Sequence, residues 1–265
     1  MEEHGQKRCA VSRLLIICLL LLITCELCLS GCAAKEKPQT PEDYLRLGDQ
    51  ELGQKRDAQA RKYYTQLIEQ YPDSDLKAQA QFKIADALYR ENNYLEAHFE
   101  YRKFLELYPL HPLASRAQFQ LGMCSLQRVQ TFDRAQIHTK EALAAFRLFR
   151  SKYPQDPLLA QAEEHIKFLR QRLAEHEFAV ARFYYRKGAY HAAIGRFLNL
   201  IQVYPDTPDI DAALYMLADS YRAEENYVKA HGVLQLLMER FPASKYVAQA
   251  RTQLRDLPQT GILLQ

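Results

Sequence analysis

The chain has 265 residues, of which 48% are hydrophobic and 25% charged, and its formal net charge is +3. This composition is typical of a globular protein with one elongated domain or two compact ones. Acidic and basic residues nearly balance and no clustered lysine/arginine run occurs, which argues against a nucleic-acid-binding face, so we expect no nucleic-acid partner.

Residues 1–31 have the features of a secretory signal. Lys7, Arg8 and Arg13 precede the uncharged stretch Leu14–Cys25. Twelve apolar residues are too few to span a bilayer, which needs about 20 in a helix. Basic residues followed by a short apolar core are typical of a cleaved signal, with a retained membrane anchor as the alternative.

The end of this segment indicates which kind of signal it is. Leu29-Ser30-Gly31-Cys32 resembles the lipobox of bacterial lipoproteins, in which cleavage precedes the cysteine and acyl chains, typically palmitate, are attached to it. We therefore expect Cys32 to carry a covalent lipid, with residues 32–40 as a short tether. Ala33 in place of aspartate favours the outer membrane, by resemblance to lipoprotein sorting in Gram-negative bacteria.

One cysteine is left once the signal is removed and Cys32 is acylated. Cys124 then has no partner for an internal disulfide, even in an oxidising periplasm. It lies within QFQLGMCSLQ, an apolar pattern with helical spacing, so we predict a buried structural thiol.

A repeat occupies the rest of the chain. An aromatic-proline pair closes five segments, at prolines 72, 109, 154, 205 and 242. Twelve, eight and five residues before each proline stand an alanine and two large side chains. The fifteen residues are Ala60, Tyr64, Leu67, Ala97, Tyr101, Phe104, Ala142, Phe146, Phe149, Ala193, Phe197, Leu200, Ala230, Leu234 and Leu237. This spacing places each triplet on one helix face, and the proline ends the helix.

The pattern predicts an all-α tetratricopeptide-repeat superhelix of about five helix pairs. We place repeats 1–3 in residues 41–156 and repeats 4–5 in residues 157–256. The third repeat has an insertion around residues 129–138, and a long helix over 157–187 connects the two halves. A last helix over about 244–255 closes the stack before a tail at 257–265.

The sequence shows no sign of an enzyme. It has no glycine-rich phosphate loop, no His-Glu-x-x-His motif and, after the signal, no Cys-x-x-Cys motif. We therefore expect no metal or cofactor other than the lipid on Cys32. Helical repeats of this kind bind peptides or protein domains in their grooves.

The order of parts resembles the BamD family, lipoproteins of the outer-membrane β-barrel assembly machinery. The most specific match is residues 168–197, FLRQRLAEHEFAVARFYYRKGAYHAAIGRF, where the family shows similar FL-x-x-RLA, VA and YY-x-x-x-GA elements and a following arginine. The resemblance implies a non-enzymatic role in receiving, folding and inserting β-barrel proteins. Its implied partners are a BamA-like barrel subunit, other assembly lipoproteins and unfolded barrel proteins.

Two groups of residues are candidates for binding partners. By resemblance, Arg196 faces BamA from the rear half, with Arg182 and Arg186 as weaker neighbours. From repeat geometry, a substrate-peptide groove in the front half should be lined by Phe82, Asp86, Tyr89, Arg90, Arg116, Phe119 and Met123. Phe82 and Phe119 have an alternative interpretation as core between helices. Replacing Arg90 and Arg116 together should weaken peptide binding without unfolding.

Other envelope repeat proteins share some of these features. A Tol-Pal helper would have a coiled-coil front and no lipobox, and no heptads occur here. A secretin pilotin would lack the long connecting helix. A scaffold for a cell-wall enzyme stays open as a third alternative.

Overall fold

The computed structural model describes residues 38–258. The signal segment, Cys32, most of the tether and the end of the tail therefore lie outside the described residues. Within residues 38–258 the chain forms eleven helices and no strand. They are α2 (Pro41–Gly53), α3 (Asp57–Gln70), α4 (Lys77–Arg90), α5 (Tyr94–Leu107), α6 (Ala114–Leu126), α7 (Ile137–Lys152), α8 (Leu159–Arg186), α9 (Tyr190–Val203), α10 (Ile210–Ala223), α11 (Tyr227–Arg240) and α12 (Val247–Asp256).

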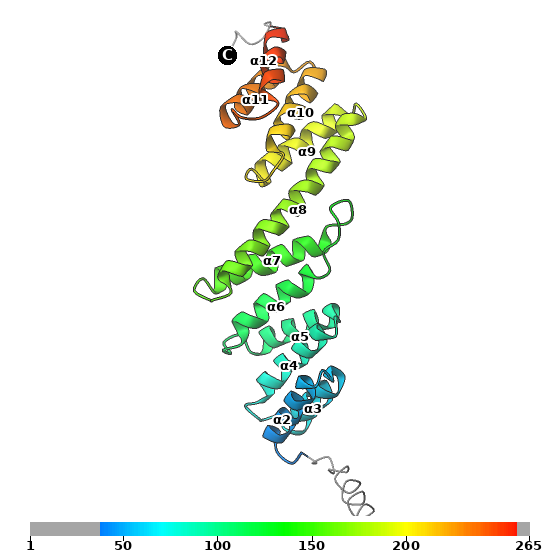
Figure 1. Cartoon of the computed structure of the whole chain (residues 1–265), viewed down its shortest axis with the longest axis vertical. Helices are drawn as coiled ribbons and strands as arrows, with labels where there is room; N and C mark the ends of the chain where they lie inside the picture. Colours follow the sequence, from blue (N-terminus) through cyan, green and yellow to red (C-terminus); the bar gives the residue numbers. More distant parts are fainter. Residues whose placement is uncertain (1–37, 259–265) are drawn as a thin grey trace, which may run out of the picture.

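The helices form one elongated stack, from α2 at one end to α12 at the other (Figure 1). Each helix packs against the next along the chain, and α10 also contacts α8. Five pairs result, α2–α3, α4–α5, α6–α7, α8–α9 and α10–α11, with α12 covering the last one. The expected all-α repeat superhelix is confirmed.

The fifteen repeat positions form the centre of the stack. Each of them is at most 1% exposed. The aromatic residue before each proline ends its helix, with φ between −127° and −132°, and its N–H donates to the carbonyl four residues earlier. Because a residue before proline avoids helical φ and ψ, the same two-residue signal stops every second helix at the same register.

Close approach of the paired helices depends on small residues opposite the large ones. A Cβ at Gly48 would lie 2.3 Å from Cε1 of Tyr64, and one at Gly122 would lie 2.9 Å from Cε1 of Phe146. Glycine at these two positions lets the ring of the second helix lie directly on the backbone of the first.

Buried tyrosine hydroxyls are satisfied by aspartates of the first helices. Tyr64 donates to Asp49 at 2.7 Å, and Tyr101 donates to Asp86. The third repeat has phenylalanine at the tyrosine position and Met123 at the aspartate position. In these three repeats donor and acceptor are thus present or absent together, as expected for polar groups in a core.

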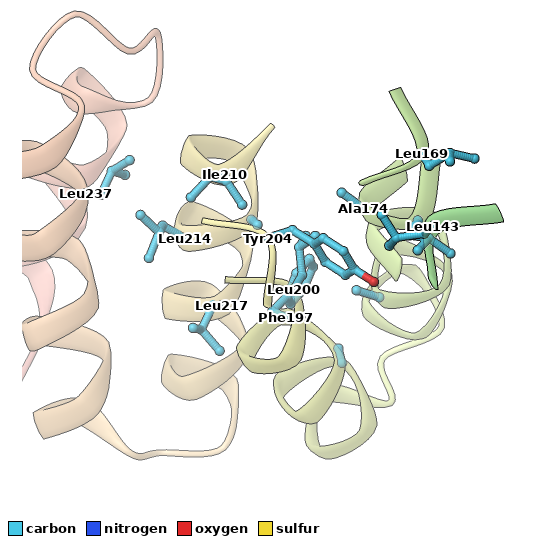
Figure 2. Packing of buried hydrophobic residues seen from close by; sticks show 14 of the residues in the cluster. Leu143, Leu169, Ala174, Phe197, Leu200, Tyr204, Ile210, Leu214, Leu217 and Leu237 are labelled. Carbon is cyan, nitrogen blue, oxygen red and sulfur yellow. The ribbon is translucent and has the colours of Figure 1, made fainter. Parts of the chain in front are cut away.

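The long helix α8 joins the front and rear halves of the stack. It has 28 residues, about 42 Å at 1.5 Å per residue, and one hydrophobic cluster extends along it from Phe119 in α6 to Leu257 beyond α12. Tyr204, at the end of α9, extends toward Ala174 of α8 and Leu143 of α7 (Figure 2). The front and rear halves, divided at residue 157, therefore share this hydrophobic cluster. Their separation into a substrate-binding half and a docking half stays a prediction about function.

The insertion of the third repeat is the segment between α6 and α7, residues 127–136. Its backbone is held from two sides. Gln136 is buried and donates to the carbonyls of Thr131 and Arg134, at 3.0 and 2.7 Å, and the Phe132 carbonyl lies 2.6 Å from Nδ1 of His176 in α8. The insertion is thereby fixed against the connecting helix.

Candidate partner-binding surfaces

Helix α9 differs from the other second helices of the pairs in its charge. Its sequence, YHAAIGRFLNLIQV, contains one charged side chain, Arg196, whereas α3, α5, α7 and α11 each contain at least three. The outer face of a solvated helix is normally rich in charge. The nearly uncharged outer face of α9 is a surface on which another protein can pack.

The exposed residues around Arg196 are small or apolar. Ala192, Gly195, Asn199 and Val203 are exposed and share its side of α9 by their i, i+3, i+4 and i+7 spacing. Val203 is 44% exposed, and a Cβ built at Gly195 meets nothing within 4 Å. We call these five residues the α9 face. One cation on a smooth surface suits a partner that presents one carboxylate among apolar groups.

Arg196 has a partner within its own chain. Its Nη1 donates to Oε2 of Glu177 in α8 at 3.4 Å. The Arg196 side chain is 49% exposed and that of Glu177 is 17% exposed. The guanidinium thus lies at the boundary between α8 and α9 and is accessible from solvent.

The two other rear arginines lie on α8. Arg182 is exposed and its guanidinium carbon lies 5.8 Å from the ring centroid of Phe178, which in turn contacts Phe197 beside Arg196. Arg186 is exposed in the last turn of α8, where a cation stabilises the helix dipole. The structure brings Arg182 to the α8–α9 boundary and leaves Arg186 at the helix end.

In the front half, two of the predicted groove residues are core residues. Phe82 packs edge-on against Tyr101 and Phe104, at 5.6 and 5.5 Å between ring centroids, and is buried. Phe119 is likewise buried, against Phe146 and Phe149. The prediction that these rings line an open groove is corrected, because their positions on α4 and α6 point into the pair and not away from it.

Two of the remaining groove candidates, Arg90 and Arg116, act on the half-buried carboxylate of a third, Asp86. Asp86 accepts from Tyr101, and burial raises the pKa of its carboxyl despite the opposing effect of Arg116, Lys83 and Arg90. The guanidinium carbon of exposed Arg116 lies 5.7 Å from the ring centroid of Phe82. Arg116 is therefore the accessible cation of this surface.

Arg90 and Tyr89 connect neighbouring repeats. Arg90 donates from Nη2 to the Leu52 carbonyl at 2.9 Å, and its Nε lies 3.0 Å from Oδ1 of Asp57. Tyr89 accepts from Nε2 of Gln127 at 3.3 Å, and burial raises the pKa of its phenol. Replacing Arg90 would thus alter the packing of repeats 1 and 2 as well as any groove.

Met123 is half-buried against the large hydrophobic cluster of the rear part of the stack. It belongs to the same row of first-helix positions as Asp49 and Asp86. The facing position of the second helix is Phe146, which has no hydroxyl that needs an acceptor.

A further groove was not expected from the sequence. It lies between α5 and α7, has a volume of about 510 Å³ and is floored by Leu121 of α6. Leu105 and Leu148 contribute apolar walls, and Arg102 and Lys152 lie at its edge. Leu148 is 44% exposed. The sequence did contain a signal for this groove, because Leu148 is a leucine outside the buried face of its helix.

The described part of the chain offers no metal-binding constellation. No group of three or more His, Cys, Asp or Glu side chains within residues 38–258 could hold an ion. No helix in that range is both long and apolar enough to cross a bilayer.

The stack of helix pairs defines a helical-repeat protein of the tetratricopeptide class, and a tetratricopeptide-repeat model matches residues 212–244. The chain belongs to the YfiO family of outer membrane lipoproteins, whose model matches residues 38–226.

Relatives in three bacteria carry the name outer membrane protein assembly factor BamD. The chain is 28% identical to the Caulobacter vibrioides protein over 234 residues, which cover 86% of this chain and 77% of the relative. It is 27% identical to the Neisseria gonorrhoeae protein, covering 91% and 97%. It is 26% identical to the Pasteurella multocida protein, covering 71% and 76%. Among solved structures, the TPR2AB domain of yeast Sti1 in its pHSP90 complex is similar at a TM-score of 0.45 and 14% identity, covering 82% of this chain and 84% of that chain.

Proposed function

We propose that this protein is a non-enzymatic, lipid-anchored subunit of the outer-membrane β-barrel assembly machinery. The observation that carries the proposal is the match of most of the chain to the outer membrane lipoprotein family, together with relatives named as assembly factors. The acyl chains on Cys32 would hold the domain at the periplasmic face of the outer membrane. Each buried CH₂ contributes about 0.8 kcal/mol, so several chains give durable anchoring.

The rear half docks on a BamA-like barrel subunit through the α9 face. Support comes from the single charge on α9 and from the exposed small and apolar residues around it. Arg196 binds a carboxylate of the partner, for which a guanidinium offers two parallel N–H donors. Arg182 contributes beside it at the α8–α9 boundary.

The front half receives unfolded barrel proteins and the other assembly lipoproteins bind elsewhere on the stack. Support for a peptide site comes from Arg116, an exposed cation that lies over the Phe82 ring and acts on the half-buried Asp86. Extended peptides with aromatic side chains and a terminal carboxylate match this combination. Phe82 and Phe119 support the site from beneath as core residues.

Co-purification of the full-length lipidated protein from detergent-solubilised membranes tests the proposal. Mass spectrometry would identify the recovered proteins and the acylated Cys32 peptide. We expect a barrel subunit that is lost on Arg196→Glu and retained on Arg251→Glu, a matched charge reversal at an exposed site on α12. Recovery of a secretin or of Tol components in place of a barrel subunit would contradict the proposed function.

A further inference from the structure

Glu177 is the carboxylate that holds Arg196 in the free chain. The two side chains come from different helices and from positions 19 residues apart, and the link is one contact of 3.4 Å between Nη1 and Oε2. A carboxylate of α8 thus already stands where a carboxylate of a partner would bind the guanidinium.

The geometry of this pair is loose. Charge-assisted N–H···O⁻ bonds are normally about 2.7–2.9 Å long, and a well-formed arginine–carboxylate pair makes two of them. Arg61 and Glu91 make a tighter pair in the front half, in which Nη2 lies 2.8 and 3.1 Å from the two carboxylate oxygens. Arg196 has one longer contact and half of its side chain in solvent, so a partner can displace Glu177, but only by replacing the contribution of this ion pair.

Within residues 38–258, the ion pair that Glu177 makes is the one with Arg196. Two further cations, Arg170 and Arg147, act on the Tyr204 phenol together with Glu177. Arg170, however, pairs with Asp206, lies over the Tyr204 ring at 5.6 Å and donates to the Val203 carbonyl at 3.4 Å. When Arg196 turns to a partner, the partly buried Glu177 is left unpaired, which opposes docking.

We infer that Glu177 is an intramolecular competitor that occupies Arg196 in the free protein and lowers the affinity of the α9 face for its partner. This inference rests on the proposed function, in which Arg196 contacts the barrel subunit. The opposite role is the alternative, in which Glu177 orients Arg196 for the partner. The two roles differ in sign: removing the charge of a competitor tightens docking, whereas removing an orienting group weakens it.

The experiment is a titration of the full-length lipidated protein in detergent with the purified periplasmic domain of the barrel subunit from the same membrane. Glu177→Gln keeps the shape of the side chain and removes its charge. Because half-exposed ion pairs contribute up to about 1 kcal/mol, we expect Kd to fall about two- to five-fold. Glu175→Gln, two residues earlier on α8 and paired with Arg172 at 3.5 Å, is the matched control and should leave Kd unchanged.

A second pair of variants separates the inference from the proposed function. Arg196→Gln should weaken binding, and in that background Glu177→Gln should have no further effect. If Arg196→Gln weakens binding but Glu177→Gln leaves it unchanged or weakens it, the competitor role is overturned and the docking role of Arg196 stands. If Arg196→Gln has no effect, the proposed docking site itself fails, and the competitor role fails with it. Thermal unfolding of each variant shows whether it is folded.

Discussion

Replacement of Gly48 by alanine tests how the helix pairs reach their close packing. In the structure an added Cβ would lie 2.3 Å from Cε1 of Tyr64 and 2.8 Å from its Cδ1 and Cζ. Carbon atoms in van der Waals contact are about 3.5–4.0 Å apart, so the overlap exceeds 1 Å. The ring cannot move aside freely, because Tyr64 is fully buried and its hydroxyl donates to Asp49 at 2.7 Å.

The expected cost follows from two opposing effects. Overpacking a core costs about 1–3 kcal/mol, and displacing the Tyr64 hydroxyl from Asp49 forfeits about 1 kcal/mol more. Alanine gains up to about 1 kcal/mol over glycine in helix propensity. We therefore expect Gly48→Ala to lower the free energy of unfolding by about 2 kcal/mol, and Tm by about 4–8 °C for a chain of this size.

The same helix supplies the control. Gly53 ends α2, and a Cβ built there meets nothing within 4 Å. Gly53→Ala should therefore leave Tm unchanged or raise it slightly, since it gains propensity without a clash. Circular dichroism at 222 nm during heating measures both variants. Equal Tm values for Gly48→Ala and Gly53→Ala would refute the packing argument.

Three further predictions concern buried polar groups. Burial raises the pKa of the Asp86 carboxyl, so the ionised carboxylate lowers the stability of the fold above the folded-state pKa and has no such effect below the unfolded-state pKa. Asp86→Asn can still accept from Tyr101, so its Tm should match or exceed that of the wild type at pH 7, and any advantage should disappear as pH falls. Calorimetry that shows the advantage growing at acid pH would contradict this. Burial raises the pKa of the Cys124 thiol to about 12, so peptide mapping should find it alkylated at pH 8 only after unfolding; rapid labelling of the native protein would show the assignment as buried to be wrong. Tyr185→Phe removes a 2.7 Å hydrogen bond to Asp219 and should lower the free energy of unfolding in urea by about 1 kcal/mol. An unchanged free energy of unfolding would contradict this and show that other donors to Asp219 replace the lost hydroxyl.

Part of the candidate site could be reached from the residues themselves. The single charge in YHAAIGRFLNLIQV is visible in the sequence and sets α9 apart from the other second helices. The role of Arg196 came from a family resemblance in residues 168–197, and its exposure on α9 agrees with that role. The companion Glu177 lies in the same block, but nothing in its spacing from Arg196 indicates contact.

The front groove shows why the rest of the candidate site could not be predicted from the sequence. Repeat geometry left Phe82 and Phe119 either on a groove surface or in the core between helices, and both are buried within their helix pairs. The helical period assigns a residue to a face, but the rotation of that helix against two neighbours decides which faces are covered. Arg90 was likewise expected to be free for a ligand and is engaged by Asp57 and the Leu52 carbonyl of the preceding repeat.

The sequence by itself determined the repeat, because the triplets and prolines are local signals: helical spacing gathers each alanine and its two large residues on one stripe, and proline ends the helix. Only the tertiary structure decided that α5 and α7 leave a groove and that Glu177 meets Arg196. Both depend on the distance and angle between neighbouring helices, which are set jointly by the side-chain volumes of several helices and by no single stretch of the chain.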